Sequence, residues 1–153
     1  MARGQLDTYS GVDVNVTIQW PGLDAIQAGG ISETGLVQVV VRMTTVRTDM
    51  KVGMDASVNV SAIPGDNGEV ELQVWQNSTL TQALNSIYNS LLAAMGQGDV
   101  SNWASGTVMI QAIVGGSQHV ATGCAFQKRP DTSYQQQAQP QNWILMAANI
   151  ANN

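Results

Sequence analysis

His119 and Cys124 are the single histidine and the single cysteine of this 153-residue chain, and they are the first candidates for metal or nucleophilic chemistry. One residue of each type cannot assemble the usual His/Cys zinc site within one chain. A Cys–His pair is also unfavourable, because side chains five residues apart in a strand project to opposite faces. No cysteine-nucleophile motif surrounds Cys124. We therefore expect a buried structural thiol, with neither metal nor cofactor.

The carboxylate pair Glu69 and Glu71 is a second candidate for chemistry. In a strand their Cα atoms are about 6.6–6.8 Å apart on one face. Paired carboxylates suit a glycosidase, but a sugar-binding cleft is normally lined by aromatic side chains. Phe, Trp and Tyr make up only 5% of the chain, and Trp75 is the nearest candidate for stacking on a sugar. We therefore expect the protein not to be an enzyme.

The two glutamates belong to a long stretch, residues 52–127, that contains no lysine or arginine. The net charge of the chain is −5. DNA binding depends on Lys and Arg that neutralise phosphates, so this stretch favours a surface to which nucleic acid does not adhere. An ordinary acidic surface is the alternative. Five acidic residues fall inside the stretch: Asp55, Asp66, Glu69, Glu71 and Asp99.

Composition predicts one domain over residues 1–153, because the length is typical of a single domain and 44% of residues are hydrophobic. Charged residues make up 11%, against about 25% in an average domain. Such depletion suits a surface covered by other subunits, or an extracellular β-protein with a neutral polar surface. The start of the chain has no apolar segment behind its arginine, which predicts synthesis in a cytoplasm without a secretion signal or membrane anchor.

Hydrophobic periodicity predicts mainly strands around one helix. Strands are expected at 12–20 and 36–46, and a hairpin at 58–74 turns at Asp66-Asn67-Gly68. Leucines at helical spacing predict a helix over 80–95, with Thr79 and Gln82 resembling a capping box. Further strands are expected at 107–114, 120–127 and 143–150, and extended loops at 21–35, 43–56 and 130–141. The fold class is mainly β (α+β), an antiparallel sandwich or small barrel flanked by one helix.

The polar face of the predicted hairpin is small and acidic, without a cation to pair its two glutamates. It is either a solvated sheet face or the lining of a negatively charged passage. Its members are Ser57, Asn59, Ser61, Glu69, Glu71 and Gln73.

Several short motifs occur in a distinctive order along most of the chain. They are Tyr9-Ser10-Gly11 before Asp13-Val14, Gly53-Met54-Asp55-Ala56-Ser57-Val58, Asn77-Ser78 before a helix with Leu84 and Ile87-Tyr88, Gly106-Thr107-Val108, and Lys128 with Pro130, Tyr134 and Trp143. In this order and spacing the chain resembles the tail tube proteins of contractile-tailed bacteriophages. Relatives often have Gly where this chain has Ala56.

The resemblance implies a structural protein of the virion tail, made in the bacterial host, that forms hexameric rings stacked into a hollow tube. Its partners would be further copies of itself and the tail sheath, baseplate and tail terminator proteins, with no membrane. DNA would pass through without specific binding, and the hairpin 57–75 would line the lumen, where Glu69 and Glu71 repel phosphates.

The cations cluster outside the acidic stretch, and the segment 43–54 is expected to contact the next ring or a neighbouring subunit. The candidate contact residues are Arg42, Arg47, Asp49, Lys51, Asp55, Lys128 and Arg129. A solvated loop is the alternative for this segment.

Two other functions stay open. A tube of a phage-derived bacteriocin or type VI-like secretion system would share the architecture without DNA transport. A monomeric β-sandwich that binds carbohydrate or protein would use Trp20, Trp75, Trp103 or Trp143 as contact residues.

Overall fold

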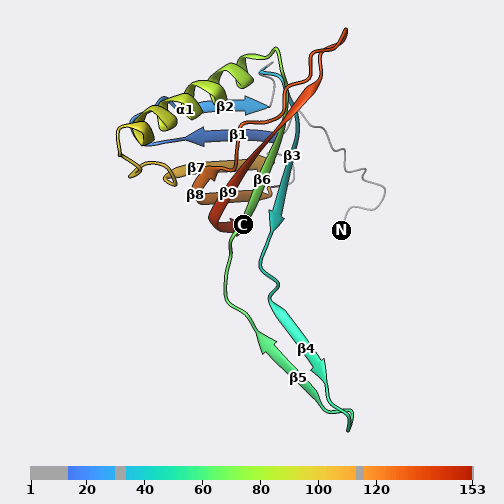
Figure 1. Cartoon of the computed structure of the whole chain (residues 1–153). Coiled ribbons are helices and arrows are strands. Elements are labelled where there is room, and N and C mark those ends of the chain that lie inside the picture. The colour runs from blue at the N-terminus through green and yellow to red at the C-terminus, as the bar shows by residue number, and fades with distance from the viewer. Residues whose placement is uncertain (1–13, 30–33, 113–115, 153) are drawn as a thin grey trace.

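The computed structural model describes residues 14–29, 34–112 and 116–152. Within these ranges the chain forms strands before and after one helix, in the order that the sequence predicts (Figure 1). Positions 9–13 of the motifs, and the predicted ends of the strands 12–20 and 107–114, lie outside the described residues. The elements are β1 (Val14–Gln19), β2 (Ile26–Gly29), β3 (Leu36–Met43), β4 (Thr48–Val52), β5 (Val58–Ala62), β6 (Gly68–Trp75), α1 (Thr79–Gly96), β7 (Gly106–Ala112), β8 (Gln118–Phe126) and β9 (Pro140–Asn152).

Seven strands form one sheet in the order β2-β1-β7-β8-β9-β6-β3, and every neighbouring pair is antiparallel. The sheet curls into a half-barrel, and α1 lies across one side of it, where it contacts β2 and β6 (Figure 1). The predicted mainly β fold with antiparallel strands and one flanking helix is confirmed.

The hydrophobic core lies between the sheet and α1. Each long strand alternates buried and accessible residues, as a sheet with one covered face requires. On β6, Val70, Leu72 and Val74 are fully buried, and the helix contributes Leu80 and Leu84 among others. An aromatic cluster fills the centre, in which the rings of Trp20 and Phe126 stack at 5.0 Å and Tyr88 and Trp143 pack edge-on against Phe126.

The helix begins one residue earlier than the predicted capping box implies. Ser78 is the N-cap, and its hydroxyl accepts a hydrogen bond from the backbone N–H of Thr81 at 3.3 Å. Gly35 passes so close that a Cβ there would lie 2.1 Å from Ser78 Cβ, so this approach requires glycine. None of the described helical residues forms a segment long and apolar enough to cross a membrane.

The predicted hairpin between 58–62 and 70–74 is wrong. β5 pairs instead with β4, whereas β6 is bonded on both sides, by β3 and by β9. The expected turn residues form hydrogen bonds to distant segments instead of closing a turn. The carbonyl of Asp66 accepts from Ile150 N–H, and that of Asn67 accepts from Thr44 N–H. The backbone of the expected turn therefore bonds to β9 and to the residue that follows β3, just before β6 begins.

Two of the segments predicted as loops contain strands: β2 lies within 21–35 and β4 within 43–56. Each of these segments is extended because it pairs with a neighbouring strand. Among the described residues β2 is short and pairs with β1, so it carries no strong periodic signal of its own. In β4 the alternation of Met50 and Val52 covers only five residues and was overlooked. The segment 131–139 is irregular, and β9 begins at Pro140.

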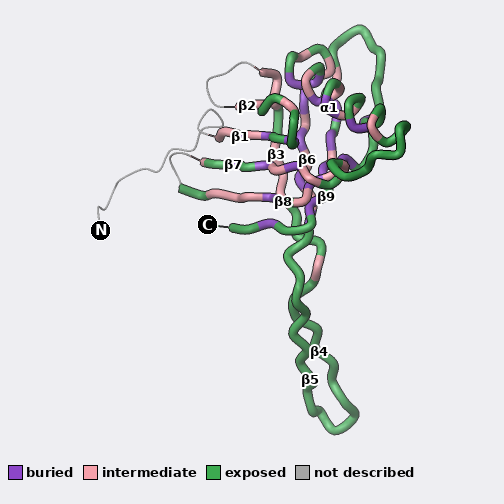
Figure 2. Tube along the Cα trace, turned by 90° about the vertical axis from the view of Figure 1, so that its left-hand side faces the viewer, coloured by how far each residue is buried: buried purple, intermediate pink, exposed green. Residues whose placement is uncertain are grey.

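The β4–β5 hairpin projects away from the sheet as an isolated two-stranded ribbon (Figures 1 and 2). Every residue of both strands is exposed. The segment 131–139, which we call the arm, extends from the opposite end of the molecule (Figure 1). The half-barrel thus carries two protruding segments that point in opposite directions.

Candidate functional site

Three of the predicted lumen residues lie together on the sheet. Glu69, Glu71 and Gln73 alternate with the buried residues of β6, so they lie on the face opposite to the core. Across from them, β9 presents Met146, Ile144 and Asn142, and β3 presents residues of the same face. This face is therefore mixed in character, with neutral polar and apolar side chains around two carboxylates.

One of these carboxylates has a cation beside it, contrary to the sequence-based expectation. Arg42 on β3 forms an ion pair with Glu71, with 2.5 Å between Nη2 and Oε2. The expectation failed because it placed residues 57–75 in a hairpin of their own and so left β3 out. Among the described residues, Glu69 forms no ion pair. The net charge of the group Arg42, Glu69 and Glu71 is thus close to −1.

The other three predicted lumen residues are not brought to this face. Ser57 follows the tip of the projecting hairpin, and Asn59 and Ser61 lie on β5, opposite Lys51 and Asp49 of β4. The six candidates were grouped only because the sequence suggested one hairpin. They belong to two separate structures, the sheet face and the polar face of the β4–β5 ribbon.

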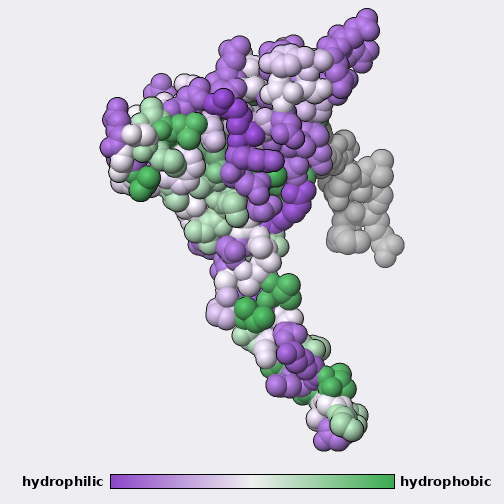
Figure 3. Space-filling view, viewed as in Figure 1, coloured by the Kyte–Doolittle hydropathy of each residue, from purple (hydrophilic) through white to green (hydrophobic). Residues whose placement is uncertain are grey.

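The opposite face of the ribbon is apolar, and the sequence analysis missed it. Met50 pairs with Val60 and Val52 with Val58, and these four side chains are 55–71% exposed. Figure 3 shows hydrophobic residues distributed along the hairpin. The sequence does contain a signal for this hairpin: apolar residues alternate with polar ones on both sides of the turn at 53–56.

Local bonds hold the two ends of the ribbon. At its base Arg47 pairs with Asp66, and Thr45 bonds Asn67. At its tip the Asp55 carboxylate accepts hydrogen bonds from the hydroxyl of Ser57 at 2.6 Å and from its backbone N–H at 3.1 Å, which lower the pKa of Asp55. Ala56 adopts a left-handed φ of 66° in this turn.

The edges of the seven-stranded sheet are β2 and β3, and on its outer side each has no neighbouring strand among the described residues. The two edges lie at opposite ends of the strand order. Open edges are templates for pairing with another chain. Arg42, one of the predicted contact residues, lies on the β3 edge strand.

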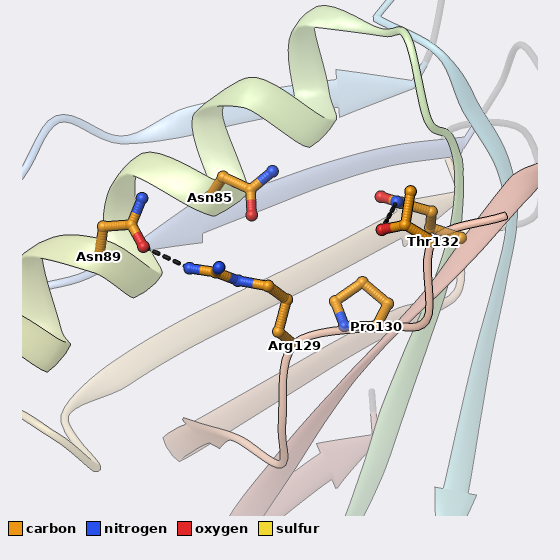
Figure 4. Close-up of a pocket in the computed structure, with 6 residues that line it drawn as sticks. Asn85, Asn89, Arg129, Pro130 and Thr132 are labelled. Atoms are coloured by element: carbon orange, nitrogen blue, oxygen red, sulfur yellow. Dashed lines mark hydrogen bonds between the residues drawn. The ribbon is translucent and has the colours of Figure 1, made fainter. Parts of the chain in front are cut away.

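Arg129, another predicted contact residue, lies beside α1. Its guanidinium donates to Asn89 Oδ1 (Figure 4). It also lies over the ring of Tyr88, 5.1 Å from the ring centroid. A cavity of about 360 Å³ opens next to it, between α1 and the start of the arm. Lys128 is exposed. The residues that line the cavity are Asn85, Asn89, Arg129, Pro130, Thr132 and Gln141.

His119 and Cys124 lie on the same face of β8, not on opposite faces as predicted, because a bulge at Gly123, whose φ is 65°, shifts the alternation. They are nevertheless separated by about 16 Å of strand. His119 contacts Asn152, and Cys124 is completely buried, which raises the pKa of its thiol to about 11. Within the described ranges, no three His, Cys, Asp or Glu residues come together as metal ligands.

The tryptophans contribute mainly to packing. Trp20 and Trp143 are fully buried, and Trp103 is partly buried against the core. Trp75 is 42% exposed. The described residues therefore provide no cluster of exposed tryptophans of the kind that the carbohydrate-binding alternative requires.

Comparisons with known proteins agree on one family and one fold. The model of the family described as Bacteriophage PhiTE tail tube protein matches residues 6–153. A search of curated protein sequences finds no match.

Three solved structures contain chains of similar fold. A chain of the extended sheath–tube complex of PVC, an extracellular contractile injection system, aligns with a TM-score of 0.56 and 11% identity, over 99% of this chain and 93% of that one. A chain of the extended PVC sheath/tube terminator aligns with a TM-score of 0.55 and 9% identity, over 100% and 99%. A chain of the tube-terminating cap of the anti-feeding prophage gives 0.52 and 9%, over 100% and 99%. At these identities the likeness concerns the fold.

Proposed function

This chain belongs to the Bacteriophage PhiTE tail tube protein family, and on that premise we propose that its 153 residues form one tube domain that assembles into hexameric rings stacked as a hollow conduit. The observation that carries the proposal is the pair of open sheet edges, β2 and β3, on a curled half-barrel. A closed ring of copies would pair each β3 with the β2 of its neighbour. Closure removes the exposed edges that otherwise lead to irregular association.

The sheet face opposite to the core is our candidate for the lumen. Its polar residues on β6 are Glu69, Glu71 and Gln73, and the neighbouring strands add Asn142 and other neutral side chains. Six copies would place six Glu69 carboxylates around the passage. Because Arg42 offsets Glu71, Glu69 is the main source of the negative field that would keep DNA phosphates from adhering.

The β4–β5 ribbon is our candidate for the contact with a neighbouring subunit or ring. Arg42 and Arg47 already have acidic partners within the chain, so they are poorly suited to attract a partner by charge. None of the described residues covers the apolar face of the ribbon, and burial of this face would stabilise an interface. Asp49, Lys51 and Asp55 would then lie at the polar rim of that contact, as Lys128 would elsewhere.

The expected partners are a sheath, a baseplate and a terminator protein, in a phage tail particle that conducts DNA during ejection. Chains of similar fold occur in a sheath–tube complex, a tube terminator and a baseplate of contractile systems. A tube of a phage-derived injection system is the second candidate, favoured by the same neighbours. A DNA-filled head distinguishes the two candidates, because a phage tail is attached to such a head and the tube of an injection system is not.

Negative-stain electron microscopy of the purified protein, with size-exclusion chromatography, tests the proposal. Rings or hollow tubes of uniform diameter are expected, with or without added baseplate to initiate them. A protein that remains monomeric at high concentration, even in the presence of preformed tube or baseplate, would contradict it and favour the monomeric binding module.

A further inference from the structure

The cavity beside Arg129 is unusual in its chemistry, because its side chains are almost all polar. Asn85 and Asn89 come from α1, and Arg129 and Thr132 come from the segment that follows β8 (Figure 4). Its volume of about 360 Å³ lies at the lower end of the range for ligand pockets. It therefore has room for a side chain or a short segment of another molecule.

Gln141 provides an unpartnered group in this cavity. The residue is only 7% exposed, and its Nε2 donates to Thr132 Oγ1 at 2.9 Å, whereas its Oε1 has no partner among the described residues. Turning the amide over would merely leave the nitrogen without a partner, since Thr132 can bond only one of the two atoms. Buried amide atoms in folded proteins are nearly always hydrogen-bonded, so this atom indicates a missing partner.

Arg129 lies at the exposed side of the same cavity. A guanidinium has five N–H donors, and the bond to Asn89 uses one of them. A group that fits both sites must accept a bond from Arg129 and donate one to Gln141 Oε1. A carboxylate lacks the donor, and an ammonium group would be repelled by Arg129. A hydroxyl can also donate and accept, but it does both through a single oxygen. The carboxamide of an Asn or Gln side chain offers two N–H donors and a separate carbonyl acceptor at one end, so it can bond both groups at once.

The chain itself carries exposed carboxamides in a suitable place. The arm contains Gln135, Gln136 and Gln137, and every residue from 131 to 138 is exposed. The arm begins at the cavity, which Thr132 lines, and extends away from the sheet (Figure 1). Its glutamines are therefore accessible to another molecule. We propose that a glutamine of the run 135–137 of a second copy enters the cavity and bonds Gln141 and Arg129. This inference rests on the proposed assembly and names one of its contacts.

Disulfide trapping between two singly substituted proteins tests the contact. Asn85→Cys protein is mixed with Gln136→Cys protein, assembled and mildly oxidised. A link can form only between copies, and the native thiol of Cys124 is buried. The matched control replaces Asn85→Cys by Gln97→Cys, an exposed position at the far end of α1. We expect at least fivefold more linked dimer from the first mixture than from the control.

A second variant reports on Gln141 itself. Adding Gln141→Met to the Asn85→Cys protein removes the unpartnered oxygen and should reduce the linked dimer severalfold, with an unchanged circular dichroism spectrum. Tubes that form without this dimer, or equal dimer from the control mixture, would overturn the inference and leave the proposed function intact. A protein that neither assembles nor cross-links would overturn both.

Discussion

Arg42 and Glu71 form their ion pair diagonally across two strands: the register places Arg42 opposite Glu69, yet its guanidinium contacts Glu71, two residues further along β6. The side chains are 50% and 19% exposed respectively. The diagonal choice leaves Glu69 as the carboxylate without an ion pair on this face. Two glutamates that look equivalent in the sequence therefore have different surroundings.

A double-mutant cycle should detect this difference. The coupling energy between Arg42→Ala and Glu71→Ala, measured by urea unfolding, is expected to be at most about 1 kcal/mol because Arg42 is half exposed. Coupling between Arg42→Ala and Glu69→Ala should be smaller. Equal coupling, or stronger coupling to Glu69, would mean that the diagonal pair does not persist in solution.

Glu69 is the position at which to test the proposed lumen. Replacing Glu71 would also break the pair with Arg42, so Glu69→Lys is the cleaner substitution. We expect particles carrying Glu69→Lys to assemble normally but to eject DNA more slowly, because a ring of cations attracts phosphates. The neutral Glu69→Gln should have a smaller effect. Ejection at the wild-type rate in both variants would exclude this face as the acidic lining.

The sequence predicts those parts of the fold and of the candidate site whose pattern lies within one continuous segment. The helix and the long alternating strands of the seven-stranded sheet carry their own periodicity and were predicted, whereas the short alternating strand β4 was expected to be a loop. The partner of a strand is not a local property, so residues 58–62 were paired with β6 on the evidence of Asp66-Asn67-Gly68. That error put Ser57 beside Glu69 and hid both the Arg42–Glu71 pair and the apolar ribbon. The Gln141 cavity joins α1 to the segment 129–141, which lies 40 residues further along the chain, and has no sequence signature.

The turn at the ribbon tip contains a strained residue, and its relief is measurable. Ala56 has a φ of 66°, a conformation that costs roughly 1–2 kcal/mol for a residue with a Cβ. Ala56→Gly should therefore slow amide exchange of β4 and β5, corresponding to about 1 kcal/mol of local stability. Ala62→Gly, in β5, should have the opposite effect. Faster exchange in Ala56→Gly would show that the loss of chain entropy outweighs the strain.

Cys124 gives a prediction for alkaline pH. Burial raises the pKa of its thiol from 9.0 to about 11, so the folded state favours the protonated form. The resulting stabilisation is complete below about pH 9 and is lost as the pH rises toward about 11. Urea unfolding of the wild type should therefore show a decline in this range that is reduced in Cys124→Ala. Identical pH profiles would indicate that the thiol is already accessible.

The apolar face of the ribbon leads to the sharpest test of association. Met50→Ser with Val60→Ser removes one cross-strand pair from that face, whereas Lys51→Ser with Asn59→Ser changes the adjacent pair on the polar face. The extensive contacts of β4 and β5 are with each other, so neither double variant should alter unfolding of the half-barrel. Burying a large apolar side chain contributes about 1.5–3 kcal/mol, and about 1.4 kcal/mol corresponds to a factor of ten in an equilibrium constant. The Met50/Val60 variant should therefore need at least tenfold more protein to assemble, measured by light scattering, and the Lys51/Asn59 variant much less. If the polar-face variant were the more impaired, the ribbon would bind its neighbour through charge and hydrogen bonds, as the sequence first suggested.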